Sequence, residues 1–143
     1  MAQSVVSIHV APARRLPTKA VDAVEAAAGR GLVGDRYHGT KHRHVTVQAT
    51  GALEAAAADL GAPVDPGRTR RNITISGAEV PTTPGQRMTI GDVELEVVRI
   101  AAPCRLMDDG IGPGAQRALH DRGGVVLRLL TSGVIRVGDA VTF

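Results

Sequence analysis

The only cysteine of the chain, Cys104, stands where a chemically reactive thiol is expected. Pro103 ends a strand-like segment just before it, Arg105 follows it, and a glycine-rich segment at 108–114, expected to be a loop, comes next. A thiol at a strand end beside a cation can be partly exposed and held as the thiolate, which attacks sulfur, binds soft metals or carries a persulfide. A lone cysteine is also commonly a small buried apolar side chain. These residues leave both a sulfur-handling role and a structural role open.

Three arginines occur together in the segment 68–72 (RTRRN), directly before a strand-like segment. A run of charge is usually a solvated loop. Arg71 and Asn72, however, immediately precede Ile73, so at least one of these side chains should project from the rim of the fold. Several guanidinium groups that converge on one spot would bind a phosphate or a carboxylate.

The segment 34–39 (GDRYHG) combines an acid, a cation and an imidazole in one turn-rich stretch. Asp35 could accept a hydrogen bond from Arg36 or from backbone amides, which would be a structural role. Zinc is a further hypothesis, because three histidines lie close together in the sequence: His38, His42 and His44. No nearby cysteine or glutamate completes a usual ligand set, so surface histidines are the better interpretation.

Several classes of protein are excluded by what the sequence lacks. It has no Walker loop, no GxGxxG after a strand, no GxSxG and no HExxH, so the common nucleotide and hydrolase sites are absent in their standard form. One cysteine cannot form an internal disulfide, which makes a reducing cytoplasm the expected compartment. No apolar run approaches the roughly 20 residues that span a bilayer, and residues 1–10 do not resemble a signal peptide, so we expect no membrane partner.

Composition predicts one domain, residues 1–143, with an aliphatic core, because the chain has no Trp, one Tyr and one Phe. A net charge of +3 does not require a nucleic-acid partner. Single-strand binders stack bases on aromatic side chains, which are nearly absent here, so we expect no nucleic acid. All but Lys19 and Lys41 of the 17 cationic side chains are arginine. This excess fits either the codon bias of a GC-rich genome or the recognition of planar or phosphate anions.

The elements that must position these residues are mostly strands. Alternating or branched aliphatic residues predict strands at 4–10, 44–48, 72–76, 93–101 and 125–130. The clearest helix is at about 50–60, with Thr50 as a cap and Gly61 at its end, and a short helix is expected at about 115–121. In the similar segments 88–95 and 135–141, a Gly-Asp pair predicts a tight reversal between strands. Residues 21–28 remain ambiguous between helix and strand. The sum is a mostly β fold, closed or folded over as a barrel.

Short motifs in a fixed order make the chain similar to the MOSC domain, named for the C-terminal part of molybdenum cofactor sulfurase. The resemblance covers roughly residues 5–143 and rests on 31–38 (GLVGDRYH), 70–77 (RRNITISG), 84–85 (PG) with 90–91 (IG), 103–104 (PC), 123–125 (GGV) and 135–139 (IRVGD). It implies an α+β, strand-rich fold built round a β-barrel similar to that of pyruvate kinase. It also implies that residues 21–28 form a strand, and that the chain is a stand-alone bacterial member without a fused desulfurase domain.

The same resemblance implies a site. Cys104 would receive persulfide sulfur, or would hold molybdenum if the pyranopterin molybdenum cofactor is bound. Basic residues at matching positions would line the pocket for an anionic ligand, and Arg105 would add to them: Lys19, Arg36, Arg70 and Arg71. Asp35, His38 and Asn72 would orient neighbours or hydrogen-bond the ligand. The chain departs from many relatives because no aromatic residue follows the Pro-Cys pair.

Four functions follow as hypotheses. The first is a cysteine-dependent, sulfurtransferase-type sulfur carrier that passes persulfide sulfur to molybdenum cofactor or another small acceptor. Its sulfur would come from a separate cysteine desulfurase or another donor. The second is a molybdenum-cofactor-binding reductase of N-hydroxylated compounds. The third is a carbon–sulfur lyase or sulfurtransferase in a biosynthetic pathway, and the fourth is a non-catalytic anion-binding domain. A dimer is compatible with each of them.

Overall fold

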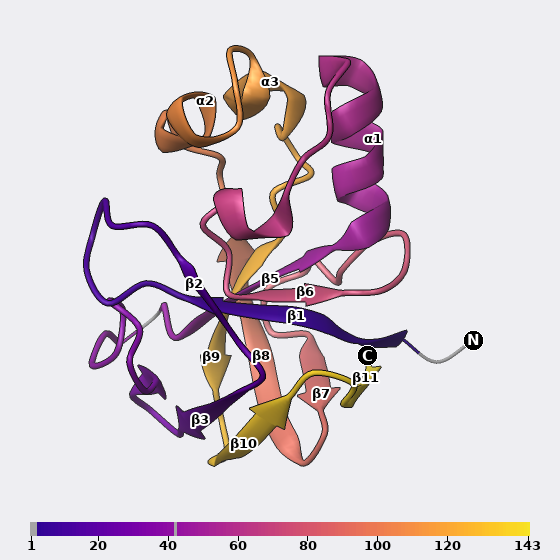
Figure 1. The fold of residues 1–143 in the computed structure, drawn as a ribbon. Coiled ribbons are helices and arrows are strands. Elements are labelled where there is room, and N and C mark those ends of the chain that lie inside the picture. Colours follow the sequence, from indigo (N-terminus) through magenta and orange to yellow (C-terminus); the bar gives the residue numbers. More distant parts are fainter. Residues whose placement is uncertain (1–2, 42) are drawn as a thin grey trace.

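Seven strands close into a β-barrel, with three α-helices over one end among the residues that the structure describes (Figure 1). The structure is a computed structural model, and it describes residues 3–41 and 43–143. The barrel strands are β1 (Gln3–Val10), β5 (Val45–Ala49), β6 (Ile73–Ile75), β7 (Arg87–Ile90), β8 (Val93–Ile100), β9 (Val125–Leu129) and β11 (Ala140–Thr142). Their order around the barrel is β1, β11, β7, β8, β9, β5, β6 and back to β1. Neighbours are antiparallel except β5 and β6, which run parallel. The mostly β barrel predicted from the sequence is confirmed.

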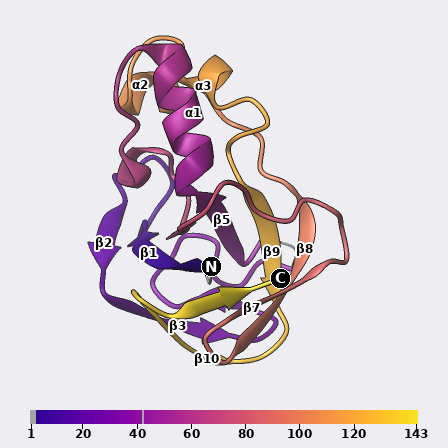
Figure 2. The ribbon, with the colours of Figure 1, turned by 90° about the vertical axis from the view of Figure 1, so that its right-hand side faces the viewer.

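Shorter strands extend the barrel. A small sheet of β10 (Gly133–Arg136), β3 (Ala23–Ala27) and β4 (Gly31–Leu32) lies at the end of the barrel away from the helices (Figure 1 and Figure 2). The ambiguous segment 21–28 is therefore extended, as the family resemblance implies. β2 (Lys19–Val21) pairs with the end of β1, which keeps the loop between them close to the helical end.

Aliphatic side chains fill the barrel, as the composition predicts. In β8, Val93, Leu95 and Val97 are buried while the residues between them are more exposed, which is the period of two expected of a strand. The buried cluster inside the barrel contains no aromatic side chain among the described residues. β5 and β6 are buried on both faces. Their outward-facing polar groups hydrogen-bond each other, for example Gln48 Nε2 to Thr74 Oγ1 at 3.0 Å.

The predicted helix at 50–60 is confirmed as α1 (Thr50–Leu60), but its first turn differs from the prediction. The residue before the helix is Ala49, and no side chain caps it, so Thr50 belongs to the helix itself. At the other end, Gly61 takes the left-handed conformation with φ of 74° and closes the helix, as predicted.

The segment between β8 and β9 holds two short helices. The expected helix at about 115–121 is shorter, as α3 (Ala115–Ala118). Part of the glycine-rich segment expected to be a loop belongs to α2 (Leu106–Gly110). Packing explains that helix, because Met107 is fully buried in a second apolar cluster. The cluster also contains two residues of α1, one of α3 and the residue that follows α3: Leu53, Ala56, Ala115 and Leu119. Tertiary contacts thus outweigh the local preference of the glycines.

Of the two tight reversals predicted at Gly-Asp pairs, the structure contains a hairpin at only one. The pair at 91–92 joins β7 to β8 in an antiparallel hairpin, as predicted. The pair at 138–139 also makes a tight turn, since Asp139 N donates to Arg136 O at 3.0 Å. The flanking strands do not pair, however, because β10 joins β3 while β11 joins β1 and β7, so the predicted second hairpin is wrong.

Among residues 3–41 and 43–143, no helix has both the length and the apolar character needed to cross a bilayer.

Candidate functional site

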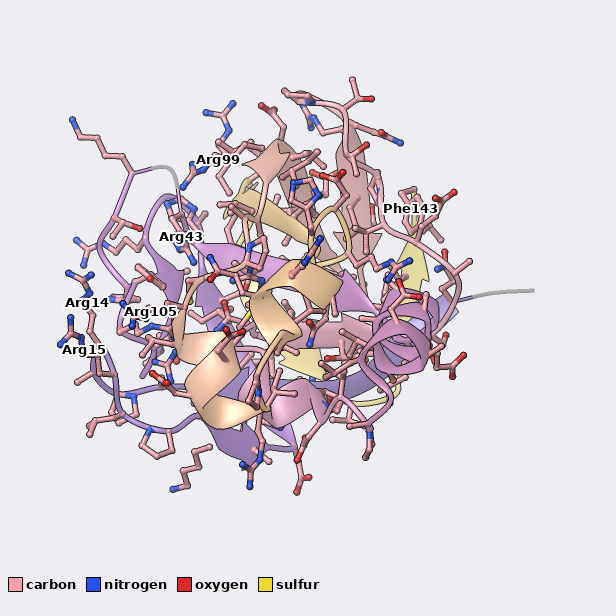
Figure 3. All side chains as sticks on the ribbon, turned by 90° about the horizontal axis from the view of Figure 1, so that it is seen from above. Arg14, Arg15, Arg43, Arg99, Arg105 and Phe143 are labelled. Carbon is pink, nitrogen blue, oxygen red and sulfur yellow. The ribbon has the colours of Figure 1, made fainter. Side chains whose placement is uncertain are left out.

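A cavity of about 530 Å³ opens at the helical end of the barrel, and its lining is strongly cationic. Cys104, Tyr37 and a single carboxylate, that of Asp109, line it together with seven arginines: Arg14, Arg15, Arg36, Arg43, Arg70, Arg71 and Arg105. They come from four segments of the chain, namely the loops after β1 and β4, the segment before β6 and the segment from β8 into α2. Figure 3 shows Arg14, Arg15, Arg43 and Arg105 gathered on one side of the molecule, opposite Phe143.

Arg71 is the most deeply buried of these cations, with 2% of its surface exposed. Its Nε donates to Gly123 O at 2.6 Å, and its Nη2 lies 2.8 Å from Ala102 O and 3.3 Å from Ala101 O. Burial, and to a smaller extent the nearby Arg43, lower the pKa of Arg71 to about 10 against the opposing attraction of Cys104. Arg71 remains charged at neutral pH and ties down the residues that lead into Cys104.

Two consecutive glycines make room for this arrangement. A Cβ at residue 123 would lie 2.9 Å from Ala101 O and 3.1 Å from Arg71 Nη2. A Cβ at Gly124, whose φ is 87°, would lie 2.0 Å from Val47 O. The pair therefore lets the chain before β9 pass between the Arg71 guanidinium and β5.

A second chain of contacts fixes Arg36 in the wall of the cavity. Asp35 is buried and its Oδ1 accepts from Ala11 N at 3.0 Å and from Arg36 Nη1 at 3.3 Å. Arg36 Nη2 in turn donates to Arg70 O at 3.2 Å. Arg70 holds a left-handed backbone with φ of 68°, which a non-glycine residue rarely adopts. Its Nη1 donates to Leu16 O at 2.7 Å.

Tyr37 lies in the cavity lining in contact with two of the arginines. The guanidinium carbons of Arg36 and Arg43 lie 4.5 and 4.3 Å from its ring centroid, within the range of cation–π contacts. Burial lowers the pKa of Arg43, and it also lowers that of Arg70, with the nearby Arg36 lowering the latter further. Arg43 Nε and Arg70 Nη2 are buried and have no hydrogen-bond partner within the described chain. Both groups are donors, so either could donate a hydrogen bond to an anion in the cavity.

Cys104 lies exposed beside these cations, between the end of β8 and α2. Its attraction raises the pKa values of Arg43, Arg70 and Arg71 against the effect of burial. The carbonyl of Cys104 accepts from Met107 N at 3.0 Å, which anchors the residue to the first turn that leads into α2. An exposed thiol in cationic surroundings can react as a nucleophile.

Five of the sequence-predicted residues line the cavity: Cys104, Arg36, Arg70, Arg71 and Arg105. Asp35 stands behind the lining and holds Arg36. Lys19 and His38 are exposed and do not line the cavity. Asn72 is buried, and its side chain bonds Thr46 and the carbonyl of His9 instead. The position of Asn72 gives no support to the prediction that Asn72 contacts a ligand, because its side chain connects the start of β6 to β5 and β1.

Sequence analysis missed Arg14, Arg15 and Arg43. Arg14 and Arg15 form an adjacent pair in the loop after β1, and that pairing is a signal that could have been used. Arg43 stands among histidines, far from Cys104 in sequence, and only the fold brings it to the cavity.

The described residues contain no group of three or more His, Cys, Asp or Glu side chains that could hold a metal ion. His44 is buried, with Nε2 2.8 Å from Thr40 O and Nδ1 accepting from Leu129 N at 2.9 Å. Its ring nitrogens thus serve the fold. His38 is exposed, and His42 lies outside the described residues.

Comparison with known proteins gives one family. The model described as "MOSC domain" matches residues 34–142. No functionally curated protein matches the chain.

The solved structures that share the fold include the following three. The YUAD protein from Bacillus subtilis superposes with a TM-score of 0.85 at 19% identity, over 99% of this chain and 94% of that one. YiiM from Geobacillus stearothermophilus gives 0.75 at 17% identity, over 98% and 74%. YiiM from Escherichia coli gives 0.71 at 16% identity, over 99% and 68%. At these identities the likeness is one of fold.

Proposed function

Because the chain belongs to the MOSC domain family, whose model matches residues 34–142, we propose that it is a cysteine-dependent sulfurtransferase. In this function Cys104 accepts persulfide sulfur and passes it to molybdenum cofactor or another small acceptor. The observation that carries the proposal is the single thiol, exposed in a cavity whose lining has seven arginines and one carboxylate.

The chemistry needs no external oxidant. The Cys104 thiolate attacks the outer sulfur of a donor persulfide, the donor's S–S bond breaks, and its electron pair leaves on the donor thiolate. A new S–S bond then joins the transferred sulfur to Cys104. Both the leaving thiolate and the persulfide on the protein are anions, so the surrounding guanidinium groups stabilise them and attract anionic ligands.

The decisive measurement is the intact mass after incubation with a cysteine desulfurase and cysteine. We expect wild-type protein to gain the mass of sulfur, reversibly with a reducing agent, and Cys104→Ser to gain none. Arg43→Gln should load more slowly, whereas Arg136→Gln, at an exposed arginine outside the cavity, should load as wild type does. Wild-type protein that stays unmodified while the desulfurase itself becomes persulfidated would overturn the proposal.

A second candidate function is a molybdenum-cofactor-binding reductase of N-hydroxylated compounds, and the unpartnered donors favour it. Arg43 Nε and Arg70 Nη2 are buried without partners, which fits the anionic groups of a pyranopterin. Those two arginines would hold the pterin's anionic groups and Cys104 would ligate the metal, which would supply redox chemistry when bound. The test is molybdenum and pterin content after purification from a host that makes the cofactor. Stoichiometric metal in wild type and none in Cys104→Ser supports this function, and none in either contradicts it.

A further inference from the structure

A second cavity, of about 570 Å³, adjoins the first. Arg15, Arg70, Leu106 and Asp109 line both, so one wall is shared. Each cavity is large enough for a ligand of drug size. A ligand that enters the second cavity therefore meets the edge of the site that contains Cys104.

The two cavities differ in charge. The first has seven arginines against one carboxylate, whereas the second has three arginines against two carboxylates, Asp65 and Asp109. The second is also lined by uncharged groups, among them Thr18, Pro17 and Gly67. A lining of both signs suits a ligand that is itself of both signs, and the first lining suits an anion.

Neutral His9 completes the second cavity. Burial lowers the pKa of His9, and Asp65 opposes that effect, so the ring is uncharged at neutral pH. Asp65 Oδ1 accepts from Gly67 N at 2.8 Å, which orients the carboxylate and leaves its other oxygen for a ligand. A Cβ at residue 67 would lie 2.9 Å from His9 Nε2, so glycine at this position leaves room in the cavity beside the imidazole.

We propose that the second cavity binds the body of a peptide-like, low-molecular-weight thiol. Its ammonium group would lie at Asp65 and its carboxylates at Arg15 and Arg68, while its sulfur reaches Cys104. This inference rests on the proposed sulfur transfer and names its donor class. The donor is then a zwitterionic thiol persulfide, and the step is the one already written: Cys104 takes the outer sulfur and the peptide-like thiolate leaves among the arginines.

The probe is S-methylglutathione, which has the charges of such a ligand but no free thiol to react with Cys104. Binding is measured by calorimetry with wild-type protein, Asp65→Asn and Asp22→Asn, and repeated with the N-acetylated probe, which lacks the ammonium charge. Asparagine can still accept from Gly67 N, so the fold is retained at residue 65. Asp22 is exposed and lines neither cavity.

We expect Asp65→Asn to weaken binding of the probe about fivefold, as for an exposed ion pair, and Asp22→Asn to leave it unchanged. The N-acetylated probe should bind wild type and Asp65→Asn equally and more weakly than the parent probe binds wild type. Equal affinity of wild type and Asp65→Asn for S-methylglutathione, or no saturable binding, overturns the inference.

A parallel arm separates this inference from the function on which it rests. Wild-type protein is treated with inorganic polysulfide and weighed intact. Loading of Cys104 without binding of S-methylglutathione rejects the donor class and keeps sulfur transfer. Absence of loading from both polysulfide and a desulfurase rejects sulfur transfer itself.

Discussion

Arg71 is held by three backbone carbonyls, whereas Arg43 Nε and Arg70 Nη2 have no hydrogen-bond partner among the described residues. Its bonds to Ala101, Ala102 and Gly123 connect the end of β8 to the start of β9. The side chain therefore positions Cys104 through the backbone before it, while it also contributes charge to the cavity.

Replacing Arg71 by methionine keeps much of the packing and removes the three bonds. We expect Arg71→Met to lower the free energy of unfolding by about 3 kcal/mol, because buried carbonyls are left without donors. Urea denaturation measures it, and Arg136→Met, at an exposed position, should stay within about 0.5 kcal/mol of wild type. A loss of less than about 1 kcal/mol for Arg71→Met would show that water replaces the guanidinium.

His9 predicts a pH dependence of stability. Its pKa in the folded protein is lowered below the usual 6.5, so the unfolded chain binds a proton more readily. The folded state is therefore penalised at low pH, and this penalty disappears as pH rises through the folded pKa towards 6.5. Denaturation midpoints at about pH 5 and about pH 7.5 should differ more in wild type than in His9→Gln. The same difference in both proteins would assign the slope to other groups.

At the scale of elements, the glycine pair before β9 decides how closely that strand approaches β5. Gly124→Ala should destabilise the protein by about 3 kcal/mol, because its Cβ would meet Val47 O at 2.0 Å. Gly138→Ala is the matched control, since Gly138 also has positive φ but no atom within 4 Å of the added Cβ. That control should lose only about 1 kcal/mol.

Thermal melts of the two variants provide the comparison. Equal losses would show that backbone conformation alone, and not the contact with β5, requires glycine at residue 124. If Gly124→Ala gives no folded protein while Gly138→Ala does, the contact is the cause, because both variants have the same conformational strain.

The local sequence pattern predicted most of the strands. It failed for elements whose structure depends on packing against residues that are distant in the sequence. The alternation of Val and Ile predicted β1, β5, β6, β8 and β9, and Ala-rich sequence with Gly61 predicted α1. α2 was missed because its glycines suggest a loop, and only burial of Met107 against α1 and α3 makes it helical. Likewise, Cys104, Arg70 and Arg71 were identified from their motifs, but no local signal links Arg43 to them. Asn72 was selected from the same motif, but its side chain accepts a hydrogen bond from Thr46 N inside the fold.

At the scale of the whole molecule, positive charge is gathered in one cavity although the net charge is only +3. Sulfate should therefore raise the melting temperature of wild type more than chloride does at equal ionic strength, because it binds the folded state. Sulfate also stabilises proteins in general, so the measurement is the difference from a variant with Arg43→Gln and Arg70→Gln. The double variant should lose the part of the sulfate stabilisation that comes from binding in the cavity, and Arg136→Gln should keep that part. An identical sulfate effect in all three would contradict a bound anion.

The pairing that closes the barrel joins the two ends of the chain, with Gln3 opposite Val141 and Ser4 opposite Ala140. Strand neighbours lie about 5 Å apart, so a linker of a few residues could connect the ends without disturbing the barrel. The sequence could then be circularly permuted, with new termini cut into an exposed loop such as 82–86. Because Phe143 lies on the side opposite the arginines of the cavity, a reporter domain fused there would leave the entrance to Cys104 open (Figure 3).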